Sequence, residues 1–585
     1  MKLIVRITFS LAIAAAVFYL ASWYESLHSN AQALYTAKAV VTMEDPRQRY
    51  EAVVVENGKV LALGARDELV EQFPDARVDN RFAEQVIYPG FIDPHVHMLL
   101  AAIEYSMIMA PPWDMPLGHG VVKGLESQRD FLRRLEEIVS EYDHEEPIIA
   151  YGYHDLVHGK IDRHMLDEIS PEKPLIVWHY STHDFYFNST GLEWAEISPA
   201  LSELYVGVEL DASGELTGRI YEDAAKSLLG KLSSRFLNPR SVRKGYQRFA
   251  ALLERGGVTT VSDLAFGIFN ETLENANMLL NWRSVKKAGF RIYLVPEYRA
   301  IHKKYGDEAV AKMQRWVSGE DFAAAPVLPQ VKFFSDGAFY SQTMRVSEPG
   351  YLAGQSSGSQ GLWVTPPEVL TDIIQPYWDA GMGVRIHSNG DASQDAVLDT
   401  LAELRKSDKE LRYIIEHAGL FSPESVQRAA ELDGAISAAS HYVFYLGESL
   451  QLPLEQPRNQ WILPLASHFE AGNKVTLHSD APLAPPLPLL AASVHVTRAT
   501  REGNVLTPSE ALTPWQALKT ITTDAAYALG LEQEIGSLKP GKLADFTVLA
   551  KDPMQVDAQD WADIEVVARV VGGRVHLNSQ SASSD

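Results

Sequence analysis

The chain has 585 residues, 46% of them hydrophobic, and a formal net charge of −24 at pH 7. This composition belongs to a globular protein with a large core and excludes a mainly disordered chain. The acidic balance argues against a basic patch that binds nucleic acid or an anionic lipid surface. Because there is no cysteine, any metal site must be built from His, Asp, Glu or a modified Lys.

The first 30 residues have the pattern of an export signal. Lys2 and Arg6 precede an uncharged run over residues 7–24. The 18 residues of this run exceed the roughly 7 to 15 of a cleaved signal core and approach the roughly 20 that span a bilayer. We therefore expect an apolar N-terminal helix over residues 1–30, retained as a signal anchor. The protein would be membrane-anchored and face the periplasm or the cell exterior, because the positive charges keep the first residues cytoplasmic. The alternative is a cleaved signal peptide and a secreted protein.

Both ends of the chain carry short segments rich in β-branched residues. Residues 35–43 and 52–63 form one such pair, and residues 541–549 and 566–577 form the other. We expect the two pairs to meet in one small β-sandwich domain, made of residues 31–88 and 530–578.

Between these ends, short apolar strands alternate with longer amphipathic stretches. This alternation is typical of repeated βα units around a parallel sheet. Eight candidate strands occur, over residues 86–97, 257–263, 291–296, 330–336, 383–389, 413–418, 434–440 and 474–480. Eight units favour an α/β fold of the TIM-barrel type over residues 89–529, with its active site at the carboxyl ends of the strands. A long insertion, residues 98–255, separates the first two strands and is well placed to form a lid or a substrate wall.

Two histidines, His95 and His97, end the first of these strands. Side chains alternate faces along a strand, so the two imidazoles point the same way and can hold one metal ion between them. The alternative is an edge strand with two solvated histidines, which is the more common case for an isolated HxH. The later strands must decide between the two.

Four later strands each carry one residue able to bind a metal, namely Lys332, His387, His417 and Asp480. A single histidine in an apolar strand is usually a core residue satisfied by hydrogen bonds. Four such residues at the ends of barrel strands instead favour one shared site.

The order of these residues resembles that of the amidohydrolase superfamily, with HxH on the first strand, Lys on the fourth, His on the fifth and sixth, and Asp on the eighth. Within the superfamily, the chain is similar to the YtcJ-like, or amidohydrolase 3, branch. The segments that carry this similarity are residues 89–97, 166–171, His183 with Asn188, 331–337 and 535–545. The resemblance implies a distorted (β/α)8 TIM barrel with a β-sandwich built from both chain ends.

The resemblance also implies which residues bind metal. His95, His97 and Asp480 would hold a first divalent ion, and His387 and His417 a second. Zinc is the default for such ligands, although iron, manganese or nickel would bind similar ones.

Lys332 would bridge the two ions after carboxylation of its amine. A plain lysine repels a metal, whereas its carbamate is anionic and offers two oxygens. The alternative for Lys332 is a buried ion pair with Asp336.

By the same resemblance, a metal-activated hydroxide attacks a carbonyl carbon. Asp480 is suited to take a proton from the attacking water and pass it to the leaving nitrogen, because amide nitrogen is a poor leaving group. His183 is a further catalytic candidate near the carbonyl oxygen, or else a structural residue. Glu222, His441 and His478 are weaker candidates near the same site.

These features favour a hydrolase that acts on a carbon–nitrogen bond other than a peptide bond, in an amide, an N-formyl amine or an N-acyl amine. The partner is a small-molecule amide-like substrate, whose acyl or aryl group we expect to be hydrophobic, and a homodimer is left open. Two alternatives stay open as well. One is a mononuclear deaminase of the same superfamily, which needs no bridging lysine, and the other is a catalytically silent envelope binding protein.

Overall fold

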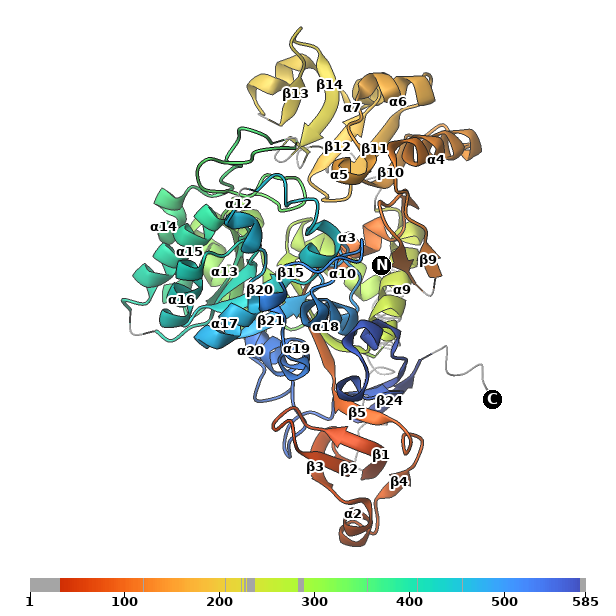
Figure 1. Cartoon of the computed structure of the whole chain (residues 1–585), viewed down its shortest axis with the longest axis vertical. Helices are drawn as coiled ribbons and strands as arrows, with labels where there is room; N and C mark the ends of the chain where they lie inside the picture. The colour runs from red at the N-terminus through yellow and green to blue at the C-terminus, as the bar shows by residue number, and fades with distance from the viewer. Residues whose placement is uncertain are drawn as a thin grey trace, which may run out of the picture.

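The computed structural model describes residues 32–578, apart from 119, 206, 222–223, 226–227, 229–236, 282–288, 355, 408 and 455. Figure 1 shows three regions along the longest axis: a sheet that includes β1 to β4 at the bottom, a barrel across the middle, and a second α/β region with β13 and β14 at the top. The candidate site lies in the barrel.

The two ends of the chain share one eight-stranded sheet, here called the terminal sheet, in the order β24-β23-β22-β5-β1-β2-β3, with β4 beside β1. The antiparallel pairing of β5 with β22 joins the two ends. Helix α2 (Arg66–Gln72) packs on this sheet through Leu69. The strands are β1 (Ala33–Val41), β2 (Arg49–Glu56), β3 (Lys59–Gly64), β4 (Arg77–Asp79), β5 (Val86–Pro89), β22 (Phe546–Leu549), β23 (Val566–Val571) and β24 (Arg574–Leu577).

A barrel strand is present in each of the eight predicted segments, but the first is shorter than predicted: of residues 86–97, only β6 belongs to the barrel, because residues 86–89 form β5 of the terminal sheet. The barrel strands run parallel in two sheets, β6-β15-β16 and β17-β18-β19-β20-β21. The ring is completed by parallel bridges, Val96 with Ala481 and Glu297 with Lys332, so the fold is a TIM-barrel-like α/β fold. The strands are β6 (Phe91–Val96), β15 (Val258–Phe266), β16 (Arg291–Pro296), β17 (Gln330–Phe334), β18 (Gly383–Ser388), β19 (Tyr413–His417), β20 (Ala435–Ala439) and β21 (Val475–His478).

Helices cover the outside of the barrel. Helix α9 shows the local reason: Asn238 caps its amino end, and a stripe of apolar residues, including Val242, Tyr246 and Phe249, is buried at intervals of three and four. These helices are α3 (Met98–Glu104), α9 (Pro239–Arg255), α10 (Glu271–Leu280), α12 (Tyr298–Tyr305), α13 (Ala309–Ser318), α14 (Pro367–Asp379), α15 (Asp391–Leu404), α16 (Pro423–Glu431), α17 (Leu465–Ala471), α18 (Pro488–Thr497), α19 (Pro514–Thr520) and α20 (Thr523–Leu529).

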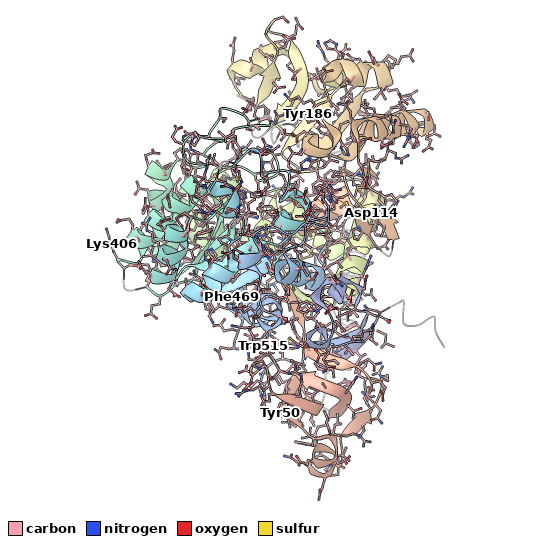
Figure 2. All side chains as sticks on the ribbon, in the orientation of Figure 1. Tyr50, Asp114, Tyr186, Lys406, Phe469 and Trp515 are labelled. Atoms are coloured by element: carbon pink, nitrogen blue, oxygen red, sulfur yellow. The ribbon has the colours of Figure 1, made fainter. Side chains whose placement is uncertain are left out.

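The insertion after β6 builds a six-stranded sheet of its own, in the order β13-β14-β12-β11-β10-β7. Tyr186 on this sheet and Tyr50 on the terminal sheet lie toward opposite ends of the molecule (Figure 2). The strands are β7 (Ile108–Met109), β10 (Ile148–Tyr153), β11 (Leu175–His179), β12 (Asp184–Phe187), β13 (Val208–Leu210) and β14 (Leu216–Tyr221), and the insertion also holds a hairpin of β8 (Met115–Leu117) and β9 (Gly120–Val122) with the helices α4 (Gln128–Glu141), α5 (Asp155–His158), α6 (Arg163–Ile169) and α7 (Ser189–Ala195).

The membrane-anchored localisation predicted above is corrected by the structure. Among the described residues, no helix is both long enough and apolar enough to cross a bilayer. The predicted N-terminal apolar helix falls on residues 1–30, which lie outside the described residues.

Candidate metal centre and active-site pocket

Gly90 marks the point where the chain passes from the terminal sheet into the barrel. A Cβ atom at this position would lie 2.1 Å from Thr259 Oγ1 on β15, so only glycine allows the two strands to approach this closely. Strand β6 then runs between β15 and β21 and is not an edge strand. Its His95 is completely buried, which excludes the solvated alternative for that residue.

Asp480 lies between the predicted metal ligands His95 and His97. Its Oδ1 lies 3.4 Å from His95 Nε2 and 3.0 Å from His97 Nε2. The backbone fixes this arrangement, because Asp480 N donates to His95 O at 3.1 Å and His97 N donates to Ala481 O at 2.9 Å. Burial raises the pKa of Asp480, but the neighbouring His95 and His97 outweigh it and hold that pKa well below its ordinary value. The cluster therefore keeps an anionic oxygen between two imidazoles.

His417 reaches the cluster through an unusual backbone conformation. Its φ is 71°, and that of Asp480 is 55°, both in the left-handed region that residues other than glycine seldom adopt. The turn at the end of β19 brings His417 Nδ1 to 3.6 Å from Asp480 Oδ2. Backbone strain of this kind is common where a side chain must be held at a functional site.

His478, a weaker candidate from the sequence, stands in the same cluster. Its Nε2 lies 3.3 Å from His417 Nδ1, and its Nδ1 lies 2.9 Å from Ser437 Oγ. Two groups of three metal-binding side chains result, each with its ligand atoms within 4.8 Å of one another: His95, His97 and Asp480, and His95, His417 and His478. His95 belongs to both.

Lys332 is buried beside these ligands, and its Nζ makes no hydrogen bond with any described residue. The ion pair with Asp336 is absent from the described part of the chain, where the Asp336 carboxylate instead accepts the backbone N–H groups of Arg345, Asn389 and Gly390. Burial lowers the pKa of Lys332 to about 8, against the opposing charge of Glu416. A substantial share of the amine is thus neutral near pH 8, which is the form that can react with carbon dioxide.

His387 lies next to the cluster but outside both groups. Its ring packs edge-on against that of His417, with the ring centres 4.5 Å apart. Its Nε2 lies 3.0 Å from the Gly337 carbonyl oxygen and 3.1 Å from Asn389 Nδ2. The structure therefore brings four of the predicted ligands together and leaves His387 hydrogen-bonded at their side.

Glu416 is a central residue that the sequence reasoning missed. It is completely buried, lies 2.8 Å from His95 Nδ1 through Oε2, and accepts a hydrogen bond from Arg385 Nε. A carboxylate behind a metal-binding imidazole fixes the orientation of the ring. No sequence pattern marked it, because neighbouring residues of a strand point to opposite faces and its position directly before His417 indicated the other face.

Tyr340, also missed, lines the pocket with a buried hydroxyl that has no hydrogen-bond partner among the described residues. No sequence pattern marked it, because it lies in an irregular segment after β17. His441 stacks on the Tyr340 ring, with the ring centres 5.4 Å apart, but does not line the pocket.

His183 comes from the insertion and lines the same pocket. Its backbone N–H donates to Ser181 Oγ at 3.2 Å, within a turn where Thr182 has a φ of 67°. The insertion thus supplies part of the pocket wall. Glu222 lies outside the described residues.

The pocket encloses a cavity of about 160 Å³ above the cluster. His95, His97, Lys332, His417 and Asp480 all contribute to its lining. The remaining wall is largely apolar and includes Leu99, Leu100, Trp178, Phe185, Ile268, Phe269, Phe334 and Leu483.

The donors in this cluster fit a divalent metal. His95 Nε2 and Lys332 Nζ are buried without a hydrogen bond in the described structure, although buried polar atoms are normally paired. Imidazole and carboxylate ligands are those that zinc and related ions prefer in the absence of cysteine.

Comparison with known proteins shows the family of the chain. The model of the amidohydrolase family matches residues 83–576. The amidohydrolase YtcJ of Bacillus subtilis (strain 168) is 24% identical over 566 residues, which cover 93% of this chain and 99% of YtcJ. The N-substituted formamide deformylase of Arthrobacter pascens is 25% identical over 542 residues, which cover 89% of this chain and 94% of that protein.

A solved structure supports the same fold. An uncharacterised metal-dependent hydrolase from Pyrococcus horikoshii OT3 superimposes with a TM-score of 0.67 at 21% identity, over 90% of this chain and 99% of that one. Because the family model spans most of the sequence, the chain belongs to the amidohydrolase family, as a YtcJ-like metal-dependent hydrolase.

Proposed function

We propose that the protein hydrolyses a carbon–nitrogen bond other than a peptide bond, in an amide, an N-formyl amine or an N-acyl amine. The observation that carries this proposal is the cluster of His95, His97 and Asp480 at the floor of an apolar pocket, beside the unpaired amine of Lys332. The likeness to an N-substituted formamide deformylase supports the choice of bond.

In this proposal His95, His97 and Asp480 would hold one divalent ion. His387 and His417 would hold a second, and carboxylated Lys332 would supply oxygen ligands to both. Zinc is the proposed metal. When bound, the metal supplies a Lewis acid that polarises the substrate carbonyl and makes water a nucleophile at neutral pH.

Asp480 performs the proton transfer. Its carboxylate takes a proton from the attacking water and delivers it to the leaving nitrogen, and each transfer of this kind contributes roughly 10²- to 10⁴-fold to a rate. Glu416 keeps His95 oriented through the contact to Nδ1. His183 and Tyr340 both line the pocket, and in this proposal they donate hydrogen bonds to the carbonyl oxygen of the substrate.

A single-metal deaminase is the second candidate, and one observation favours it. His387 Nε2 is engaged with the Gly337 carbonyl, and His387 belongs to neither group of three ligands in the barrel. Elemental analysis separates the two candidates. One tightly bound ion, unaffected by Lys332→Ala, would favour the deaminase, and two ions that depend on Lys332 would favour the bridged hydrolase.

Activity of the metal-loaded protein tests the principal proposal. A panel of N-formyl amines and N-acyl amines should release free amine, and Asp480→Asn should slow the best substrate by roughly 10²- to 10⁴-fold. Unchanged turnover in Asp480→Asn would exclude the mechanism. A metal-loaded protein that cleaves nothing in the panel would favour the silent binding protein.

A further inference from the structure

Arg299 lies at the rim of the pocket, in the first turn of α12 after β16, and lines the cavity. Its guanidinium carbon stands 4.2 Å from the centre of the Phe334 ring. Phe334 in turn stacks on His387, with ring centres 5.2 Å apart and planes at 30°. The rings of Phe334 and His387 therefore lie between the Arg299 guanidinium and the candidate metal centre.

The orientation of Arg299 is fixed from behind. Its Nε donates to Glu297 Oε1 at 2.8 Å, and Glu297 Oε2 accepts the backbone N–H of Ala300 at 2.7 Å. The Glu297 side chain is only 2% exposed, whereas that of Arg299 is 30% exposed. The two terminal nitrogens of Arg299 have no hydrogen-bond partner in the part of the chain that the structure describes.

Two acidic side chains that line the same pocket, Asp263 and Glu274, already accept hydrogen bonds from backbone N–H groups. Asp263 accepts the backbone N–H groups of Met98 and Ala265. Glu274 likewise accepts two backbone N–H groups, those of Gly267 and Phe269. Neither carboxylate is turned toward the Arg299 guanidinium in an ion pair. Among the described residues that line the pocket outside the ligand cluster, Arg299 thus carries a permanent positive charge and has terminal N–H groups without a hydrogen-bond partner.

The surface between Arg299 and the cluster is apolar. Phe334 lies directly under the guanidinium, and Ile268, which is 45% exposed, lines the same opening. A ligand that spans this pocket meets the metal ligands at one end, an apolar wall in the middle and a cation at the rim. An arginine fork matches a carboxylate in shape and charge.

We propose that Arg299 binds an anionic group of the substrate, so that the natural substrate is an N-acyl or N-formyl amine whose apolar arm ends in a carboxylate. This inference rests on the proposed function and defines the substrate class of the same site. A carboxylate at the rim would add two charge-assisted hydrogen bonds without displacing any described partner of the terminal nitrogens.

Matched substrates test it. An N-acyl amine whose arm ends in a carboxylate is compared with its primary amide, using wild-type protein, Arg299→Gln and Arg299→Lys. Arg133→Gln, an exposed arginine of α4 whose side chain is 62% exposed, is the control. We expect Arg299→Gln to lower kcat/KM for the carboxylate substrate by about 10- to 100-fold through KM, to leave the amide substrate unchanged, and Arg299→Lys to lie between.

Equal losses on both substrates would mean a structural role and would overturn the inference, as would no loss on either. Calorimetric binding of 4-phenylbutyrate and 4-phenylbutyramide gives a readout that does not need turnover. If the protein cleaves no substrate, the proposed function fails and the substrate class fails with it; Arg299 is still an anion-binding residue if wild type binds the carboxylate tighter than the amide and Arg299→Gln does not. Carboxylate binding that is independent of Arg299 would place the anion elsewhere and overturn it.

Discussion

Two buried histidine clusters in this molecule look alike by proximity and differ in chemistry. Both lie at the carboxyl ends of neighbouring parallel strands. In the barrel, His95, His97 and Asp480 lie within 4.8 Å of one another, and in the insertion His154, Asp155 and His179 meet the same criterion. The first group opens into the pocket, and the second contributes nothing to its lining.

Access to the cavity, more than hydrogen bonding, separates the two clusters. His179 has both ring nitrogens engaged, Nδ1 with Ser181 Oγ at 2.8 Å and Nε2 with Asp155 Oδ1 at 3.1 Å. His95 Nε2 and His154 Nε2 both lack a hydrogen bond among the described residues, but only His95 lines the pocket. Proximity alone therefore does not define a metal site; donors left free and open to a cavity do.

The largest expected effect comes from removing the ligand that both barrel groups share. His95→Ala should abolish tight metal binding and lower turnover by more than the roughly 10- to 100-fold that outer-shell changes cause. His154→Ala is the matched control and should leave metal content and turnover unchanged. Equal metal loss in both variants, measured by elemental analysis, would remove the distinction between the clusters.

The next largest effect is expected from Glu416→Gln, which removes the buried carboxylate behind His95. Glu416→Gln leaves the Arg385 guanidinium buried without its ion pair, which should cost about 3–5 kcal/mol in the free energy of unfolding. The metal should also bind about 10- to 100-fold more weakly. Thermal denaturation and metal titration measure the two effects. A stable variant with wild-type metal affinity would contradict the orienting role.

A smaller effect is expected at the pocket wall. Tyr340→Phe should lower kcat by about 10-fold or more if its hydroxyl donates to the developing oxyanion, with little change in stability because the hydroxyl has no described partner. Tyr413→Phe is the reverse control, since its hydroxyl donates to Val397 O at 2.9 Å far from the pocket lining. It should lose about 0.5–1.5 kcal/mol of stability and no activity.

The smallest effect tests the insertion cluster again. His179→Gln should lower the free energy of unfolding by about 1–2 kcal/mol, since hydrogen bonds to Ser181 and Asp155 are weakened, and should not change the number of bound metal ions. A metal ion lost in this variant would show that the second cluster also binds one.

The sequence was sufficient to predict those features of the fold that follow from local patterns and from the order of the strands. Apolar runs separated by amphipathic stretches located all eight barrel strands, and the parallel arrangement then forced His95, Lys332, His417 and Asp480 to one end. The β-branched segments at both ends likewise indicated that the ends would meet, although the strand that pairs with β22 is β5, which the sequence reasoning had assigned to the first barrel strand. Such features follow from side-chain period and strand direction alone.

The site needed more than these patterns. Glu416 looked like part of an apolar strand, and only the closed barrel shows that it faces His95 and Arg385. His478 joined the cluster because β21 lies next to both β20 and β6, which no local pattern contains. The insertion appeared as a gap between strands, yet it folds into a six-stranded sheet.

By itself, then, the sequence determined the barrel, the joining of the chain ends and the set of residues that could meet at the barrel mouth. Only the tertiary structure decided which of them do meet. The left-handed backbone at His417 and Asp480 turns those side chains inward, whereas the Gly337 carbonyl holds His387 aside. Both outcomes depend on contacts between strands far apart in the chain, and such contacts leave no periodic trace in the sequence.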